Sequence, residues 1–130
     1  MSINKDLATV IARYQRYPQF MGIDIIEVNQ RAAMNDTMLH FAAERGSTED
    51  IDVLVASGAE VNADGDIGNT PLHGAAMKGN IPAASRLLEL GADPTLRNEL
   101  GQCARDVALV GGHEELAQFL STSKARYRKH

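Results

Sequence analysis

The chain has 130 residues, of which 44% are apolar and 23% are charged, so it is long enough for one globular domain and does not resemble a disordered protein. Its single cysteine, Cys103, excludes an intramolecular disulfide framework. The formal net charge is −4, but four basic residues lie in the last seven positions, and the rest of the chain carries 9 basic against 17 acidic residues. Because an acidic body repels phosphate backbones, we do not expect nucleic acid as the main partner.

Residues 1–27 are expected to form an N-terminal helical cap. Leu7, Val10, Ile11 and Tyr14 fall on one stripe of a helix-like stretch, and Pro18 ends that stretch. No apolar run here has the length of a signal peptide core or a membrane span. We therefore expect a soluble, cytoplasmic protein with no membrane partner.

Residues 28–121 repeat themselves with a period of 33 residues. Thr37-Met-Leu-His40 is followed at that step by Thr70-Pro-Leu-His73 and then by a degenerate third copy, Cys103-Ala-Arg-Asp106. Such a period is typical of stacked repeats, each too small to bury its apolar face alone. We expect three repeats, at about 30–62, 63–95 and 96–121, and a flexible basic tail at 122–130.

Each repeat is expected to hold two short helices and a polar, turn-rich loop. Thr37 and Thr70 are placed as helix N-caps, and His40 and His73 are placed to bond back to them, so we assign these four residues a structural capping role. Glycines then end the first helix of each pair. The second helices are predicted at about 49–57, 81–90 and 114–121.

The block GNTPLHGAAMKG at Gly68–Gly79, which closes with LLELGAD at Leu87–Asp93, resembles an ankyrin repeat. The resemblance covers about residues 28–121. It implies an all-α fold, an ankyrin-repeat solenoid of stacked antiparallel helix pairs with projecting β-hairpin loops. As a small stand-alone ankyrin repeat protein, the chain resembles bacterial members of the family.

The resemblance also implies a non-catalytic protein-binding module without cofactors, whose concave surface of finger tips and first helices contacts another protein. We expect a monomer with no small-molecule substrate; the alternatives are a toxin- or effector-neutralising (immunity-type) inhibitor and, less favoured, a regulatory subunit of an enzyme. Phe41 and Met77 are predicted as central contacts, with Arg45 and Asp66 steering the partner. The projected binding surface consists of Ala33, Met34, Asp36, Phe41, Glu44, Arg45, Asp66, Ile67, Asn69, Met77, Lys78, Glu99, Leu100 and Gln102.

Three residue patterns suggest other chemistry and are weighed against that interpretation. Cys103 stands at a helix start, where a thiol pKa falls, but it replaces a capping threonine, so a structural role is favoured over a nucleophile. The histidines lack the spacing of metal ligands. The Arg126-Tyr-Arg128 tail leaves nucleic-acid binding open as a third hypothesis.

Overall fold

Three helix pairs follow the period of 33 residues in the computed structural model, which describes residues 5–126. Each first helix begins directly after the residue expected to cap it, Thr37, Thr70 or Cys103. The pairs are α2 (Met38–Arg45) with α3 (Thr48–Ala56), α4 (Pro71–Met77) with α5 (Ile81–Glu89), and α6 (Ala104–Val110) with α7 (Glu114–Arg126).

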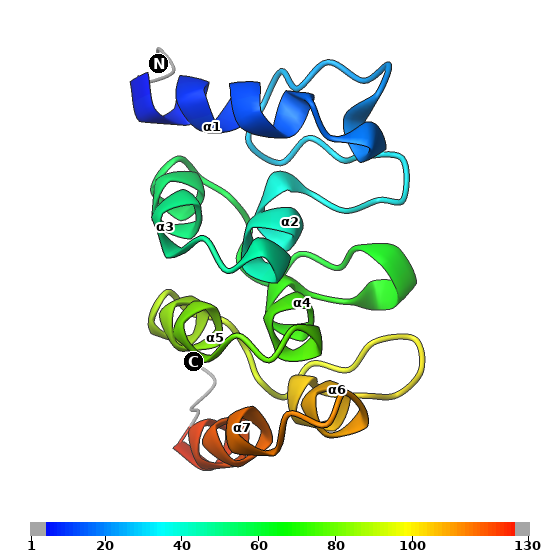
Figure 1. Ribbon diagram of the computed structural model, residues 1–130, viewed down its shortest axis with the longest axis vertical. Helices are drawn as coiled ribbons and strands as arrows, with labels where there is room; N and C mark the ends of the chain where they lie inside the picture. Colours follow the sequence, from blue (N-terminus) through cyan, green and yellow to red (C-terminus); the bar gives the residue numbers. More distant parts are fainter. Residues whose placement is uncertain (1–4, 127–130) are drawn as a thin grey trace.

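The pairs stack in two columns, with α2, α4 and α6 in one and α3, α5 and α7 in the other (Figure 1). The first helices pack closely on one another because their facing residues are small. Ala42, Ala75 and Ala108 occupy one position of the repeat and are fully buried. Ile51, Leu54 and Leu87 of the second column are also fully buried, so the core is a continuous layer between the two columns.

The N-terminal segment closes the upper end of this stack. Helix α1 (Lys5–Gln15) packs on α3 but lies across the end of the stack, at a steep angle to the helices below it (Figure 1). Tyr14 on its buried stripe is fully covered, and a short 3-10 helix, η1 (Pro18–Phe20), follows. The segment therefore supplies an outer helix without a first helix of its own.

Three loops project from the side of the first helices, as Figure 1 shows, and a backbone hydrogen bond closes the base of each. The bonds run from Ala32 N to Asp36 O, from Gly65 N to Asn69 O and from Asn98 N to Gln102 O, at 2.7, 2.8 and 2.9 Å. They recur at the repeat period. Each finger also contains a turn bond, such as Asn35 N to Ala32 O, but these bonds are too few to form a ladder, so residues 5–126 contain hairpin-like fingers without β-strands.

The C-terminal boundary differs from the prediction. Helix α7 continues past Ser121 to Arg126, so the expected flexible tail at 122–130 begins inside a helix. The stretch after Ser121 contains no glycine or proline that would stop the helix. Arg128 and Lys129 lie outside the described residues. Among residues 5–126, no helix combines the length and apolarity that crossing a membrane requires.

Candidate functional site

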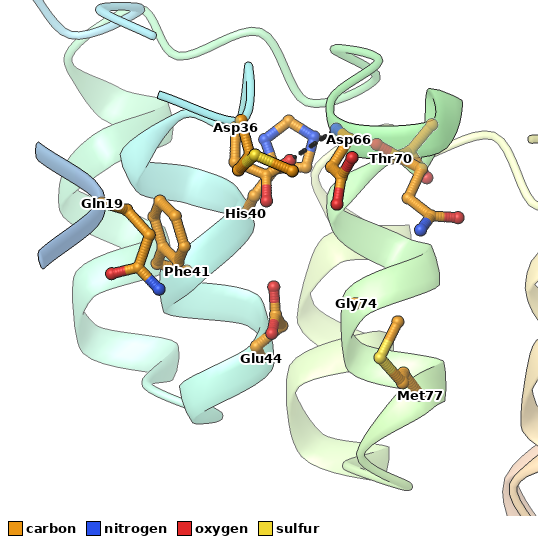
Figure 2. A pocket seen from close by; sticks show the side chains of 11 residues that line it. Gln19, Asp36, His40, Phe41, Glu44, Asp66, Thr70, Gly74 and Met77 are labelled. Atoms are coloured by element: carbon orange, nitrogen blue, oxygen red, sulfur yellow. Dashed lines mark hydrogen bonds between the residues drawn. The ribbon is translucent and has the colours of Figure 1, made fainter. Parts of the chain in front are cut away.

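Two adjoining hollows mark the face formed by the fingers and the first helices. The first hollow, of about 250 Å³, lies between the first and second repeats, with Glu44 on α2 and Met77 on α4 at its sides (Figure 2). It is lined by Gln19, Met34, Asp36, His40, Phe41, Glu44, Asp66, Asn69, Thr70, Gly74 and Met77.

The second hollow, of about 260 Å³, lies one repeat further along, between α4 and α6. It shares Asn69 and Met77 with the first hollow, so the two hollows adjoin along the stack, and together they are called the groove. Its lining residues are Ile67, Asn69, Met77, Asn98, Leu100, Gln102, Val107, Val110 and Gly111.

The polarity of the groove changes from one repeat to the next at equivalent positions. The position on the first helix that is Glu44 in the first repeat is Met77 in the second and Val110 in the third. The position at the base of the finger changes from Asp36 to Asn69, and both residues line the first hollow. The groove is therefore acidic at its N-terminal end and apolar at its C-terminal end.

Gly74 creates the space of the first hollow. A Cβ atom built on this glycine would meet the Cγ of Glu44 at 3.0 Å, whereas the equivalent residues of the other repeats carry side chains, Phe41 and Val107. The absence of a side chain on α4 thus leaves the hollow open between Glu44 and Met77, as the labelled side chains in Figure 2 show.

The acidic end carries three carboxylates, Asp36, Glu44 and Asp66, and none of them forms an ion pair within residues 5–126. Asp36 Oδ1 accepts a hydrogen bond from the backbone N–H of Asp66 at 2.8 Å. The pKa of Glu44 is raised, first because its carboxyl group is partly buried and then because Asp36 is near. Within the described chain, no lysine or arginine lines the first hollow.

Apolar side chains are exposed along the same groove. Met77 and Ile67 are each 44% exposed, and Met34, Leu100 and Val110 are more exposed still. Ile67, at the tip of the second finger, has a φ of 58°, a left-handed conformation that is unfavourable for a β-branched residue. Such strain is concentrated at functional sites, because it persists only where the surroundings enforce it.

The prediction that Phe41 is an exposed contact is wrong. Its side chain is only 8% exposed, and its ring packs against the rings of Tyr17 and Phe20 at centroid distances of 5.7 and 5.8 Å. The cause is the N-terminal cap, which folds over this part of α2 and covers the ring. Phe41 therefore forms a wall of the first hollow and belongs to the core.

Arg45 lies outside both hollows and is engaged elsewhere. Its guanidinium group pairs with the buried carboxylate of Asp50 on α3 at 3.0 Å. Asp50 also pairs with Arg13 at 2.7 Å and accepts a hydrogen bond from the Tyr14 hydroxyl at 2.9 Å. This cluster fixes the N-terminal cap to the first repeat, which differs from the steering role predicted for Arg45.

Three other residues of the projected binding surface, Ala33, Lys78 and Glu99, are exposed but line neither hollow. Sequence reasoning in turn missed Gln19, Asn98, Val107, Val110 and Gly111. The step of 33 residues would have pointed to Val107 and Val110, which correspond to Gly74 and Met77. Gln19 gave no such signal, since it comes from the non-repeating cap.

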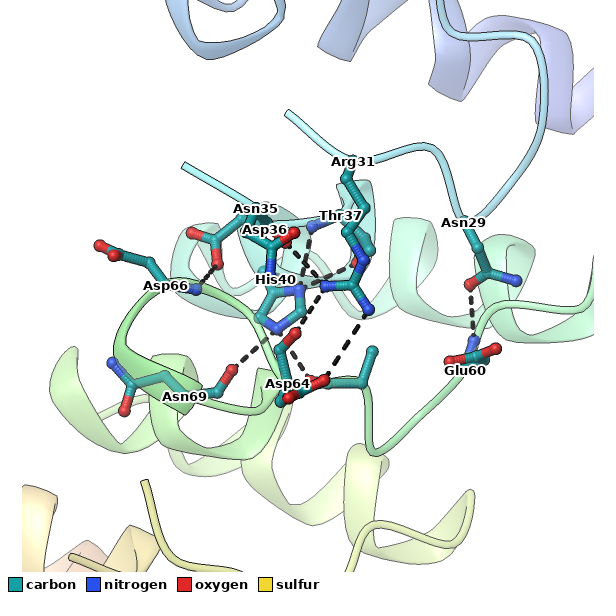
Figure 3. A network of polar contacts seen from close by, with 11 residues as sticks. Asn29, Arg31, Asn35, Asp36, Thr37, His40, Glu60, Asp64, Asp66 and Asn69 are labelled. Atoms are coloured by element: carbon teal, nitrogen blue, oxygen red, sulfur yellow. Dashed lines mark hydrogen bonds and ion pairs between the residues drawn. The ribbon is translucent and has the colours of Figure 1, made fainter. Parts of the chain in front are cut away.

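The four residues assigned to capping join successive repeats. In the first repeat, Nδ1 of His40 accepts a hydrogen bond from the backbone N–H of Thr37 at 3.0 Å, and its Nε2 lies 2.9 Å from the carbonyl oxygen of Asn69 (Figure 3). His73 accepts from Thr70 in the same way, with its Nε2 2.8 Å from Gln102 O.

The same hydrogen bonds fix the charge state of both histidines. Because Nδ1 accepts, the proton resides on Nε2, which can donate to the carbonyl oxygen of the next finger. Burial lowers the pKa of both rings, so His40 and His73 are neutral at pH 7.

Arg31 and Asn29 add two further ties between segments one repeat apart. The guanidinium group of Arg31 donates to Asn35 O within its own finger and to Asp64 O of the next one (Figure 3). Asn29 accepts from Glu60 N at 2.9 Å, and the equivalent Asn62 accepts from Asp93 N at 2.8 Å. These ties hold the fingers at fixed positions relative to one another.

Cys103 takes the place of the capping threonine in the third repeat. Its thiol is 2% exposed and lies 3.3 Å from Oδ2 of Asp106, which also accepts from the Cys103 backbone N–H. That backbone bond is the main reason why the pKa of Asp106 is lowered. Among the described residues, no group of three His, Cys, Asp or Glu side chains is arranged to hold a metal ion.

Comparisons with known proteins agree with this architecture. The sequence model of the family described as "Ankyrin repeats (3 copies)" matches residues 19–98 and again residues 39–129. The two matches together span most of the chain, including the whole groove. A comparison with curated proteins found no match.

Proposed function

Because the chain belongs to the ankyrin-repeat family, whose repeats are generally protein–protein interaction modules, we propose that it binds a partner protein in the groove formed by the two hollows. The observation that carries this proposal is the pair of adjoining hollows between the fingers and the first helices, bordered by exposed apolar side chains. Met77 belongs to both hollows and is the proposed centre of the contact.

Rigidity of the groove supports a binding role. The histidine bonds and the asparagine ties fix each finger to its neighbour, so little conformational entropy is lost when a partner binds. Methionine side chains adapt to the shape of a partner, and apolar anchors surrounded by polar residues are typical of interface centres. The strained backbone at Ile67 is consistent with selection for an apolar side chain at that finger tip.

We propose that the protein performs this role without catalysis. The groups that would be needed for nucleophilic chemistry have structural partners: the Cys103 thiol is buried against Asp106, and His73 is bonded to Thr70 and to Gln102. A catalytic constellation needs a nucleophile and a base that face a shared space. Cys103 and His73 instead cap different helices, α6 and α4.

The test compares two apolar residues that are equally exposed, Met77 inside the groove and Leu109 outside it, each 44% exposed. A partner recovered with the wild-type chain is titrated against M77E and L109E by calorimetry, after circular dichroism has shown that both variants fold. We expect M77E to weaken binding by at least about tenfold, roughly 1.4 kcal/mol, and L109E to leave it unchanged. Equal affinities of the two variants would show that the groove is not the binding site.

A further inference from the structure

The change of polarity along the groove defines the partner segment more closely. We infer, on the basis of the proposed function, that the groove binds an extended segment of the partner that carries a lysine or arginine three residues from a large apolar residue. The basic side chain enters the first hollow and the apolar side chain enters the second.

The first hollow is complementary to a cation. Asp36, Glu44 and Asp66 contribute carboxylates to it. Lys78 lies near enough to influence Glu44, but within residues 5–126 no positively charged side chain forms an ion pair with any of the three. Its walls are partly apolar, since Met34, Phe41 and Met77 also line it. A lysine or arginine fits both features, because its methylene stem packs on apolar surface while its charged end reaches a carboxylate.

The second hollow has the opposite character. Met77, Leu100, Val107 and Val110 line it, and among the described residues that line it none is charged. Its polar side chains are amides, and that of Asn98 donates hydrogen bonds to the side-chain oxygens of Asn69 and Gln102. An aliphatic or aromatic side chain of the partner would therefore lose water on entering without leaving a charge buried and unpaired.

The distance between the hollows sets the spacing of the two partner residues. The hollows occupy equivalent places one repeat apart, between α2 and α4 and between α4 and α6. Packed helices lie roughly 8–10 Å apart. A chain in the extended polyproline II conformation advances about 3.1 Å per residue and has three residues per turn, so two residues three apart point to the same side at a separation of about 9 Å. A helix, at about 1.5 Å per residue, needs about seven residues for the same distance.

The size of the hollows favours the extended form. Each hollow, of about 250 or 260 Å³, has room for one large side chain, and the two adjoin at Asn69 and Met77. A helix is about 10–12 Å across with its side chains and would rest on the rims of the hollows. An extended segment can follow the shared border and place one side chain in each.

The test uses a phage-displayed library of random twelve-residue peptides, selected on the full chain. Synthetic peptides made from the selected sequences are titrated against wild type, E44Q and M77E, and each peptide is also made with its basic residue replaced by alanine. E49Q is the matched control, because Glu49 is exposed on α3 and the change in net charge is the same. Circular dichroism checks that each variant is folded.

We expect selected peptides to share a lysine or arginine at a spacing of three from an apolar residue, in either chain direction. E44Q should weaken the binding of a peptide with its basic residue about fivefold, and it should leave the affinity of the alanine-substituted peptide unchanged. E49Q should change the affinity of neither peptide. M77E should weaken both peptides.

The other possible outcomes contradict either the inferred partner segment or the proposed function. Peptides that need Met77 but lack the basic residue, or show no coupling to Glu44, refute the inference and leave the proposed function intact. A spacing of seven, or no selected peptide at all, refutes the extended segment. Peptides that bind equally well to wild type and M77E contradict the proposed function itself.

Discussion

Replacing His73 by alanine tests whether buried histidines join the repeats. The ring is 1% exposed; it accepts from Thr70 N at 3.0 Å and lies with its Nε2 2.8 Å from Gln102 O. Truncation leaves both backbone groups without these partners, at about 1–3 kcal/mol each, and opens a cavity. We therefore expect H73A to lose about 3–5 kcal/mol of the free energy of unfolding.

His113 provides the matched control for this loss. Its Nε2 lies 3.1 Å from Met77 O, but the ring is only half-buried and this hydrogen bond is exposed to water. We expect H113A to lose less than about 1 kcal/mol. Urea unfolding followed by circular dichroism measures both values. Similar losses in the two variants, or a loss below about 1.5 kcal/mol for H73A, would refute the proposed role of the histidine.

Three further predictions follow from the same geometry. Asn tolerates a positive φ, so I67N should raise the free energy of unfolding by about 1 kcal/mol while weakening partner binding. Leu100 lies at a finger tip without a positive φ, so L100N should not raise the free energy of unfolding. A gain in L100N would contradict the explanation of the I67N gain by relief of backbone strain. Removing the Asp50 carboxylate in D50A should lower the free energy of unfolding by about 2 kcal/mol and speed hydrogen exchange in α1 first, because Arg13 and Tyr14 lose their partner. Uniformly faster exchange along the chain would argue that this cluster does not fix the cap to the first repeat. The folded-state pKa values of His40 and His73 are below the ordinary value of 6.5, so the unfolded chain binds more protons in this pH range. The free energy of unfolding should therefore fall as the pH drops below about 6.5. H73A should show a smaller fall, and an equal fall would contradict the conclusion that His73 is buried in its neutral form.

The repeat architecture could be predicted from the sequence because its signals are local and recur. Thr37 and Thr70 precede helix starts, and glycines such as Gly46 and Gly79 adopt the positive φ that a helix end needs. Each signal depends only on neighbouring residues, and the period repeats it. The end of α7 was misplaced because no stop signal follows Ser121, which left the boundary undefined.

The groove could be predicted only in part. Projection of the repeat correctly brought together residues such as Asp36, Glu44 and Met77, since they lie at equivalent or adjacent positions of the unit. The burial of Phe41 depends on Tyr17 and Phe20, which belong to a cap outside the period. Arg45 and Asp50 lie only five residues apart, but the pairing of Asp50 with Arg13 depends on how α1 packs on α3, and no local pattern specifies that packing.

The most direct test of the binding groove is a nuclear magnetic resonance titration of the isotope-labelled chain with its partner segment. We expect the largest shift changes at Met34, Glu44, Ile67, Met77 and Val110, which border the two hollows on three successive repeats. The outer helices α3, α5 and α7 should change little. Shift changes concentrated on those outer helices, with the groove unaffected, would contradict the account.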